Sequence, residues 1–344
     1  MKMNIFSNTL LLVCLLIATE SCSSIESGEN KKGDSTNANN APEKITQPWQ
    51  KPIDTAMFDK LCKDLANGDT TGKWPVKSVY PLAGAIFPFN RVVAYYGNLY
   101  SKKMGILGEL PKDQMLAKLK GECKKWQDAD SSIPVIPALH YVSVTAQGAA
   151  GKDGKYRARM PFHQIDTIVK WANEIKGLAF LDIQVAHSTV GAEVPQLEKY
   201  LMMPNVHLGI DPEFSMKNGE RPGTVIGNFT ADDINVAVDY LAALVKKNNL
   251  PPKILVVHRF TQGMVKQFQN IKKLPEVQVV IDMDGWGDKI LKLSSHLRYV
   301  KAEPVQFGGF KLFYKNDTKT GVNQLYTPQE LLKFIPKPIY IQYQ

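Results

Sequence analysis

The sequence lacks several features that define common classes of protein. After the first 21 residues, no run of about 18 consecutive apolar residues occurs, so we expect no transmembrane helix in the rest of the chain. No strand-like run leads into GxGxxG or GxxxxGKS/T, which removes the usual evidence for a nucleotide site. Neither a CxxC pair nor a Cys/His cluster occurs, and a structural zinc site is therefore not expected.

Cysteine and concentrated positive charge are also scarce. Of four cysteines, Cys14 and Cys22 belong to the N-terminal segment, while the helix-like contexts of Cys62 and Cys123 leave a disulfide between them open in an exported protein. The formal net charge is +9, but the lysines are scattered and form no basic stripe. We therefore expect no nucleic-acid partner, and a monomer.

The N-terminus has the order of a bacterial export signal. Lys2 precedes an apolar stretch at 9–18 that is too short to span a bilayer, and "TESC" (19–22) follows it. This resembles a lipoprotein signal over residues 1–21, with Cys22 as the acylated, palmitate-bearing first residue. An ordinary cleaved secretion signal is the alternative. Acylation would hold the protein at a membrane of the cell envelope, on its periplasmic or outer surface.

Residues 22–48 are rich in Ser, Asn, Gly, Lys and Glu and have almost no large apolar side chains. Such a segment buries too little surface to fold, so it is predicted to be a flexible linker between the anchor and a domain at 49–344.

Eight strand-like runs alternate with helix-like stretches in this domain. Most of the runs are continuously apolar, as expected for strands covered on both faces. The alternation predicts a single (β/α)8, TIM-type barrel, with a doubly wound open sheet as the alternative. The runs lie at 92–96, 135–144, 178–185, 206–210, 254–258, 277–283, 310–314 and 339–343.

Helices are predicted from apolar spacing and from end signals. Thr230 and Asp233 form a capping-box pattern at the start of one of them. A further helix at 54–67 either caps the barrel floor or takes the place of the helix after the last strand. The remaining predicted helices lie at 112–126, 162–176, 194–203, 230–249, 261–273, 288–297 and 327–335.

Polar side chains gather where the predicted strands end, which is the end at which barrel enzymes hold their active sites. Each of these side chains, taken alone, could have a purely structural role. Lys311, for instance, alternates with apolar neighbours and could point outward between helices. Together they predict one site, because acids within apolar runs are costly unless paired. The expected substrate-binding residues are Tyr96, Asn98, His140, Gln184, Asp211, His258, Asp284, Trp286, Lys311 and Tyr314.

Two carboxylates that flank a bond, one protonated and one ionised, hydrolyse glycosides. Glu213 in "GIDPEF" (209–214) is the expected acid, because Asp211 would raise its pKa by like-charge repulsion. The predicted catalytic set is Glu213, Asp282 and Asp182, with Asp284 as an alternative partner of Glu213 across the barrel mouth, and with no cofactor and no metal. Tyr96, Trp286 and Tyr314 would stack on sugar rings of an envelope or environmental glycan.

This arrangement resembles retaining barrel glycosidases, many of which hold the acid/base Glu at the end of strand 4. The nucleophile of those enzymes lies on strand 7, where this chain has Lys311. Two other functions stay open. One is a metal-dependent, phosphodiesterase-like hydrolase that uses the His and Asp residues as ligands, and the other is a non-catalytic, glycan-binding surface lipoprotein.

The stretches "YYGN…MGILGE" (95–109), "LDIQ", "GIDPEF", "VVHRF" and "MDGWG" also resemble a family of exported bacterial barrel proteins without an assigned activity. Some members carry cell-wall-binding segments. The resemblance covers about residues 90–344, and it implies an envelope location and a site at the strand ends without naming a substrate.

Overall fold

We describe a computed structural model of the protein over residues 51–319 and 324–344. The predicted signal at 1–21, the acylation site Cys22 and the whole linker at 22–48 lie outside the described residues, and these assignments stay predictions.

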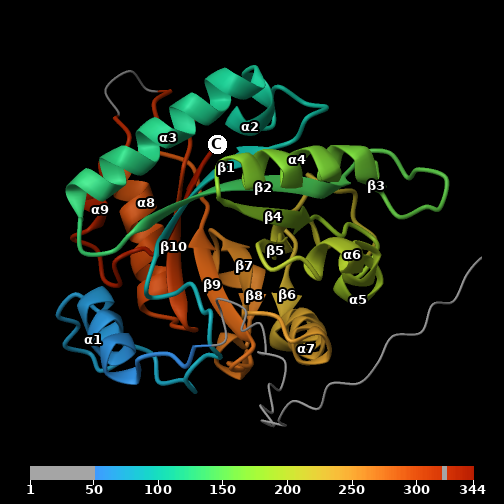
Figure 1. The fold of residues 1–344 in the computed structure, drawn as a ribbon. Helices are drawn as coiled ribbons and strands as arrows, with labels where there is room; N and C mark the ends of the chain where they lie inside the picture. The colour runs from blue at the N-terminus through green and yellow to red at the C-terminus, as the bar shows by residue number, and fades with distance from the viewer. Residues whose placement is uncertain (1–50, 320–323) are drawn as a thin grey trace, which may run out of the picture. The chain divides into compact units, whose positions relative to one another are not determined.

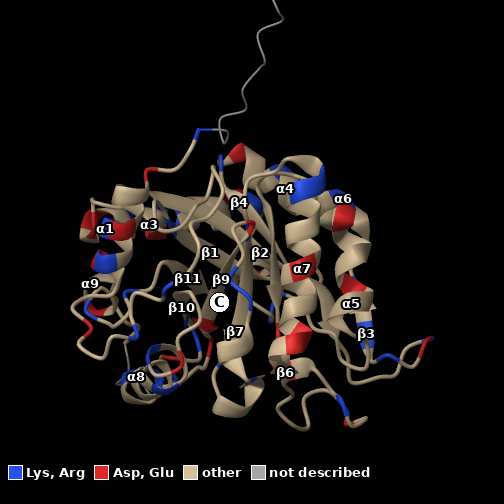
Figure 2. Cartoon of the chain, turned by 90° about the horizontal axis from the view of Figure 1, so that it is seen from below, with Lys and Arg blue, Asp and Glu red and all other residues tan. Residues whose placement is uncertain are grey.

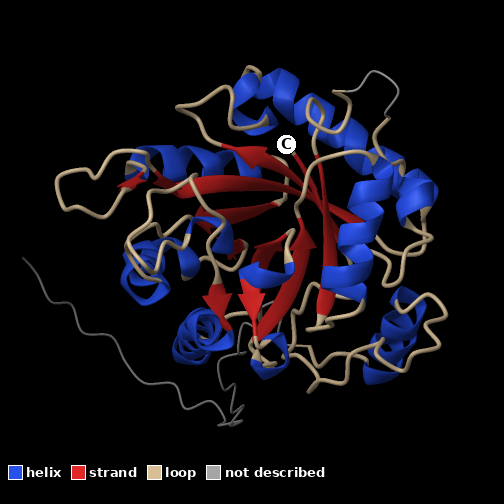
Figure 3. Cartoon of the chain, turned by 180° about the vertical axis from the view of Figure 1, so that it is seen from behind, coloured by secondary structure: helices blue, strands red, loops and turns tan. Residues whose placement is uncertain are grey.

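Eight parallel strands close into a barrel (Figures 1 and 3). The first strand, β1, pairs in parallel with β2 on one side and with β11 on the other, which rules out the open sheet. The (β/α)8 prediction is therefore confirmed. The barrel strands are β1 (Arg91–Gly97), β2 (Val135–Ala146), β4 (Leu178–Ile183), β5 (Val206–Ile210), β7 (Lys253–Arg259), β9 (Val277–Met283), β10 (Phe307–Leu312) and β11 (Tyr340–Tyr343).

The inward face of the strands changes from apolar to polar toward their carboxyl ends. Ala94, Ala138, Phe180, Val256 and Val280 belong to one buried apolar cluster inside the barrel. Side chains on a strand face the same side at every second residue. Two residues further along the same five strands, the interior therefore receives Tyr96, His140, Asp182, His258 and Asp282.

Helices cover the outside of the barrel, and most begin and end close to the predicted positions. The Thr230–Asp233 capping box is present at the start of α7 (Ala231–Asn248). Leu65 of α1 (Thr55–Leu65) packs into the interior cluster beside Phe307 and Ile339, so α1 caps the barrel floor. The other helices are α2 (Ile106–Glu109), α3 (Lys112–Ala129), α4 (Phe162–Glu174), α5 (Val190–Glu193), α6 (Glu198–Leu201), α8 (Lys289–His296) and α9 (Pro328–Leu331).

Two predicted elements were wrong in extent or type. The segment 261–273 forms short 3-10 turns and the strand β8 (Val265–Lys266), which pairs with β6 (Phe229–Thr230). Gln267 adopts φ 57° there, and this left-handed conformation prevents a continuous helix. The strand expected at 310–314 begins earlier, at Phe307, and includes two consecutive glycines that the apolar pattern did not indicate.

The surface carries both signs of charge. Lys and Arg residues alternate with Asp and Glu residues over the outer helices, in agreement with a dispersed basic charge (Figure 2). Cys62 and Cys123 are free thiols, and burial raises the pKa of each to about 12. Within the described ranges, no helix has the length and apolarity required to cross a bilayer.

Candidate functional site

A cavity of about 630 Å³ opens at the carboxyl ends of the barrel strands. Its lining comes from the end of β1, from the segments after β4, β5 and β9, and from β10. Most of the predicted substrate-binding residues are therefore brought to one place. The polar and aromatic lining includes Tyr96, Gln184, Asp211, Glu213, Phe214, Phe260, Asp284, Trp286, Lys311 and Phe313.

Asp211 supports the turn that presents Glu213. Its Oδ1 accepts a hydrogen bond from the Glu213 amide at 3.1 Å and so caps the 3-10 turn Pro212–Phe214. Its Oδ2 accepts another from the Gln184 side chain at 3.1 Å. Burial raises the pKa of Asp211 well above its usual range. Asp211 is thus held from two sides and acts as a positioning residue.

Glu213 lines the cavity with its carboxyl partly buried. Burial and, next, the negative charge of Asp284 raise its pKa to about 7, against the opposing effects of Lys311 and His258. The predicted direction of this shift agrees with the structure. The charged neighbour that contributes most is Asp284 rather than Asp211.

A polar cluster lies beneath the cavity floor, centred on His258. The imidazole Nε2 lies 3.4 Å from Asp182 Oδ1, while Nδ1 lies 3.3 Å from Asp284 Oδ2 and 3.5 Å from Asp282 Oδ2. Burial alone would lower the pKa of His258, but the surrounding carboxylates, first Asp182, raise it well above the usual value. Asp284 therefore belongs both to this cluster and to the cavity wall.

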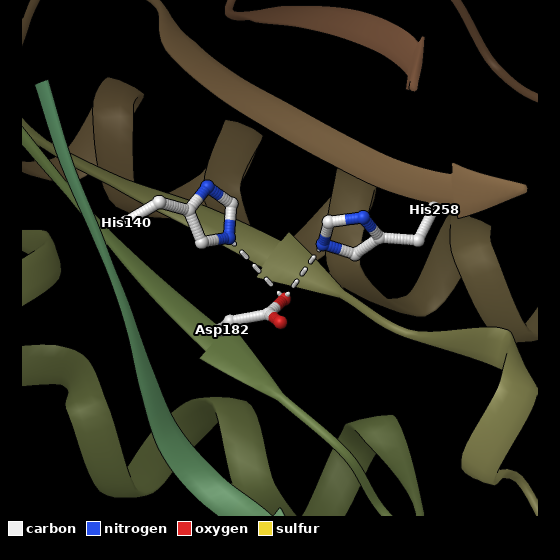
Figure 4. A group of neighbouring side chains, drawn as sticks. All are labelled: His140, Asp182 and His258. Carbon is white, nitrogen blue, oxygen red and sulfur yellow. Dashed lines mark ion pairs between the residues drawn. The ribbon is translucent and has the colours of Figure 1, made fainter. Parts of the chain in front are cut away.

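His140 approaches Asp182 from the other side (Figure 4). Its Nε2 lies 3.5 Å from Asp182 Oδ1, and its Nδ1 lies 2.6 Å from the Tyr340 hydroxyl. The Tyr96 hydroxyl donates to Asp182 Oδ2 at 3.2 Å. Burial lowers the pKa of His140 to about 4. Burial would raise the pKa of Asp182, but the two histidines hold it below its ordinary value.

Two glycines allow these side chains to come so close. A Cβ atom on Gly209 would lie 2.4 Å from Asp182 Oδ1 and 2.5 Å from His140 Nε2. A Cβ atom on Gly309 would lie 2.8 Å from Asp282 Oδ1. Neither position tolerates a side chain while the cluster keeps this geometry.

Lys311 points into the barrel. Its Nζ lies 3.7 Å from the centroid of the Tyr96 ring, and the residue is 3% exposed. The alternation of Lys311 with apolar residues had left an outward orientation open. The structure shows that the side chain points inward instead. Its ammonium group also covers the Tyr96 ring, so Tyr96 is not available as a platform for a sugar.

Some predicted site residues lie elsewhere. Asn98 is buried in a turn, where its amide donates to the Val142 carbonyl. Tyr314 lies outside the barrel wall, where its hydroxyl contacts the Tyr95 hydroxyl and donates to the Glu122 carboxylate. Neither residue lines the cavity, because β1 ends at Gly97 before Asn98, and Tyr314 follows β10 on the side away from the interior. Asp182 and Asp282 are fully buried beneath it and do not face a substrate.

Sequence reasoning missed Tyr340, which holds the His140 ring. The signal was available, since Tyr340 is two residues from Gln342 in β11 and therefore faces the interior with it. It also missed the aromatic wall formed by Phe260 and Phe313, whose positions beyond strand ends have no periodic pattern.

Comparisons with known proteins give limited information. No family model and no curated protein matches the chain. Among solved structures, the chain is similar to a sugar phosphate isomerase/epimerase from Parabacteroides distasonis, with 10% identity and a TM-score of 0.33. The match covers 78% of this chain and 90% of that one. A likeness at this level carries no information about substrate or mechanism.

Proposed function

We propose that the protein is a barrel hydrolase that cleaves a glycosidic bond of an envelope or environmental glycan. The observation that carries this proposal is Glu213, a cavity-lining carboxyl whose pKa is raised to about 7 by burial and by nearby Asp284. A carboxyl of this kind is protonated near neutral pH and is suited to act as an acid.

In the proposed reaction, Glu213 donates its proton to the oxygen of the leaving sugar. Asp284 supplies the second carboxylate, which either activates water or attacks the sugar carbon. Its Oδ2 lies 3.3 Å from His258 Nδ1. Asp284 thus takes the role that was assigned to Asp282, because Asp284 lines the cavity and Asp282 does not. Asp182 supports His258 from below.

The remaining lining suits a carbohydrate. Trp286 is 56% exposed at the cavity wall, and Phe260 and Phe313 also line it. Aromatic faces of this kind pack against the C–H faces of sugar rings. Gln184 and Lys311 supply polar groups beside them. An acylated Cys22 and the linker at 22–48 would carry this cavity at the surface of an envelope membrane.

The proposal is tested with a panel of nitrophenyl glycosides and with the release of reducing ends from cell-wall polysaccharide. Glu213→Gln should lower kcat by about 10²- to 10⁴-fold, since it removes the proton donor while keeping the shape. Glu174→Gln, on the outer surface of α4, is the matched control and should keep full activity. Full activity of Glu213→Gln, or binding of glycans by the wild type without any turnover, would contradict the proposed function.

A further inference from the structure

The geometry points to a binding site for one divalent transition-metal ion of the Zn²⁺ type, formed by His140, Asp182 and His258 beneath the cavity floor (Figure 4). This inference does not depend on the proposed function, because the three residues lie below the carboxyls that would carry out the hydrolysis.

The carboxylate oxygen lies from each imidazole nitrogen at about the separation that a tetrahedral metal requires. Asp182 Oδ1 lies 3.5 Å from His140 Nε2 and 3.4 Å from His258 Nε2, and all three atoms lie within 4.8 Å of one another. Zinc bonds to nitrogen and oxygen are about 2.0–2.1 Å long, so tetrahedral ligand atoms lie roughly 3.3–3.4 Å apart. The same separations are long for direct hydrogen bonds.

These atoms are also buried without hydrogen-bond partners. Among the described residues, His140 Nε2, Asp182 Oδ1 and both ring nitrogens of His258 lack such a partner. The three side chains are between 0 and 1% exposed. Buried polar atoms are rarely unpaired in folded proteins, because each lost interaction costs roughly 1–3 kcal/mol. A shared cation would satisfy Asp182 Oδ1 and one nitrogen of each imidazole.

Two of the three proposed ligands have a hydroxyl group that orients them from behind, and a carboxylate lies close to the third. The Tyr340 hydroxyl lies 2.6 Å from His140 Nδ1, and the Tyr96 hydroxyl donates to Asp182 Oδ2. Asp284 Oδ2 lies 3.3 Å from His258 Nδ1. Carboxylates and hydroxyls behind metal-bound imidazoles set the tautomer and the ring orientation. The described residues thus supply three potential ligands, and two of them are hydrogen-bonded to an outer hydroxyl.

The charge around the cluster favours a cation. Asp182, Asp282 and Asp284 are each at most 8% exposed, and the buried lysines Lys311 and Lys292 lie near them. Uncompensated buried carboxylates are strongly unfavourable, and a dication would offset two of these charges. The competing arrangement is an imidazolium at His258, shared by Asp182 and Asp284, which leaves His140 Nε2 at 3.5 Å from its nearest acceptor.

Metal content is the direct test. The full-length protein, purified without a metal-affinity tag, should retain about one Zn²⁺ per chain after dialysis. The chelator-treated protein should bind about one Co²⁺ and give the intense visible absorption of a tetrahedral N/O site. X-ray absorption on the zinc-loaded wild type should show two imidazoles at about 2.0–2.1 Å. These measurements need no variant and no substrate.

Variants then assign the ligands. His140→Gln and His258→Gln should each abolish stoichiometric Co²⁺ binding. Tyr340→Phe keeps the aromatic packing and removes the hydroxyl beside His140, which also accepts from Gln342. It should weaken Co²⁺ binding about 10- to 100-fold, because the three proposed ligands remain. The control is His163→Ala combined with His187→Ala, two histidines away from the cluster, and it should bind Co²⁺ as the wild type does.

The inference is overturned if the wild type binds neither Zn²⁺ nor Co²⁺ at micromolar concentration, or if binding survives in His140→Gln and is lost in the control. Absence of hydrolysis with one bound ion per chain would count against the proposed function alone.

Discussion

Glu213 lies three residues beyond the end of β5, and its environment differs from that of Asp211, two residues before it. Asp211 is held by Gln184 and by the Glu213 amide, whereas the Glu213 carboxyl lines the cavity within the influence of Asp284. The sequence could show that two acids end this strand. It could not show which distant carboxylate faces Glu213, since that depends on how the loop after β9 folds over the barrel mouth.

The raised pKa of Glu213 has a consequence for stability. The ordinary pKa is 4.5 and the folded protein raises it to about 7, so between these values the folded state holds the proton more tightly and stability falls as the pH rises. At pH 8 the full penalty is present. Glu213→Gln removes the charge and should raise the free energy of unfolding by about 1–3 kcal/mol at pH 8 and change it little at pH 4.

Denaturant unfolding at both pH values measures this difference, with Glu174→Gln as a variant for which no pH-dependent gain is expected. Equal differences at pH 4 and pH 8 for Glu213→Gln would show that the folded protein does not raise the pKa of this carboxyl.

The loops after β9 and β10 are joined by a buried ion pair. Lys292 of α8 lies 2.9 Å from Asp317, and it donates to the carbonyls of Gly285 and Lys311. Asp317 accepts from the amides of Gly287 and Phe313. These contacts position the segment that carries Trp286 at the cavity wall. No periodic pattern indicates them, because the partners come from a helix and from two irregular segments.

Replacing Lys292 with Met should lower the free energy of unfolding by about 3–5 kcal/mol, because Asp317 is left buried and unpaired. Lys289→Met on the same helix breaks a partly exposed pair with Glu330 and should cost about 0–1 kcal/mol. Thermal and denaturant unfolding of both variants compare the two costs. A similar small loss for both variants would show that the ion pair between Lys292 and Asp317 does not stabilise these loops.

Among the secondary-structure elements, the sequence indicated all eight strands and most of the helices, since continuous apolar runs and end signals are local features. The segment 261–273 was assigned wrongly because its apolar spacing resembles a helix, while pairing of Val265 with Phe229 decides its structure. The early start of β10 was missed because Gly308 and Gly309 weaken the strand pattern where the barrel needs close packing.

For the molecule as a whole, barrel closure explains why distant motifs form one site. Residues from β2, β4 and β7 are more than 40 positions apart in sequence, yet parallel strands in register bring His140, Asp182 and His258 together. The existence of a site at this end was therefore predictable from strand count. The division of this site into an exposed cavity and a buried cluster was not predictable, since it depends on how deeply each side chain lies inside the barrel.

The location of the whole protein is a separate prediction. If Cys22 is acylated, Cys22→Ser should move the full-length protein from the membrane fraction to the supernatant and abolish incorporation of labelled palmitate. Fractionation and labelling of cells that express both forms measure this. A Cys22→Ser protein that remains with the membranes would instead require another means of attachment.

The central claim is that Glu213 is the acid of a glycan hydrolase, and the pH dependence of kcat/KM tests it most directly. On the best substrate of the glycan panel, the wild type should lose activity as the pH rises through about 7, approaching a tenfold loss per unit, because Glu213 loses its proton. The residual activity of Glu213→Gln should lack this descent. A wild-type profile that is flat or rising from about pH 6 to 9, or the same descent in Glu213→Gln, would contradict the claim.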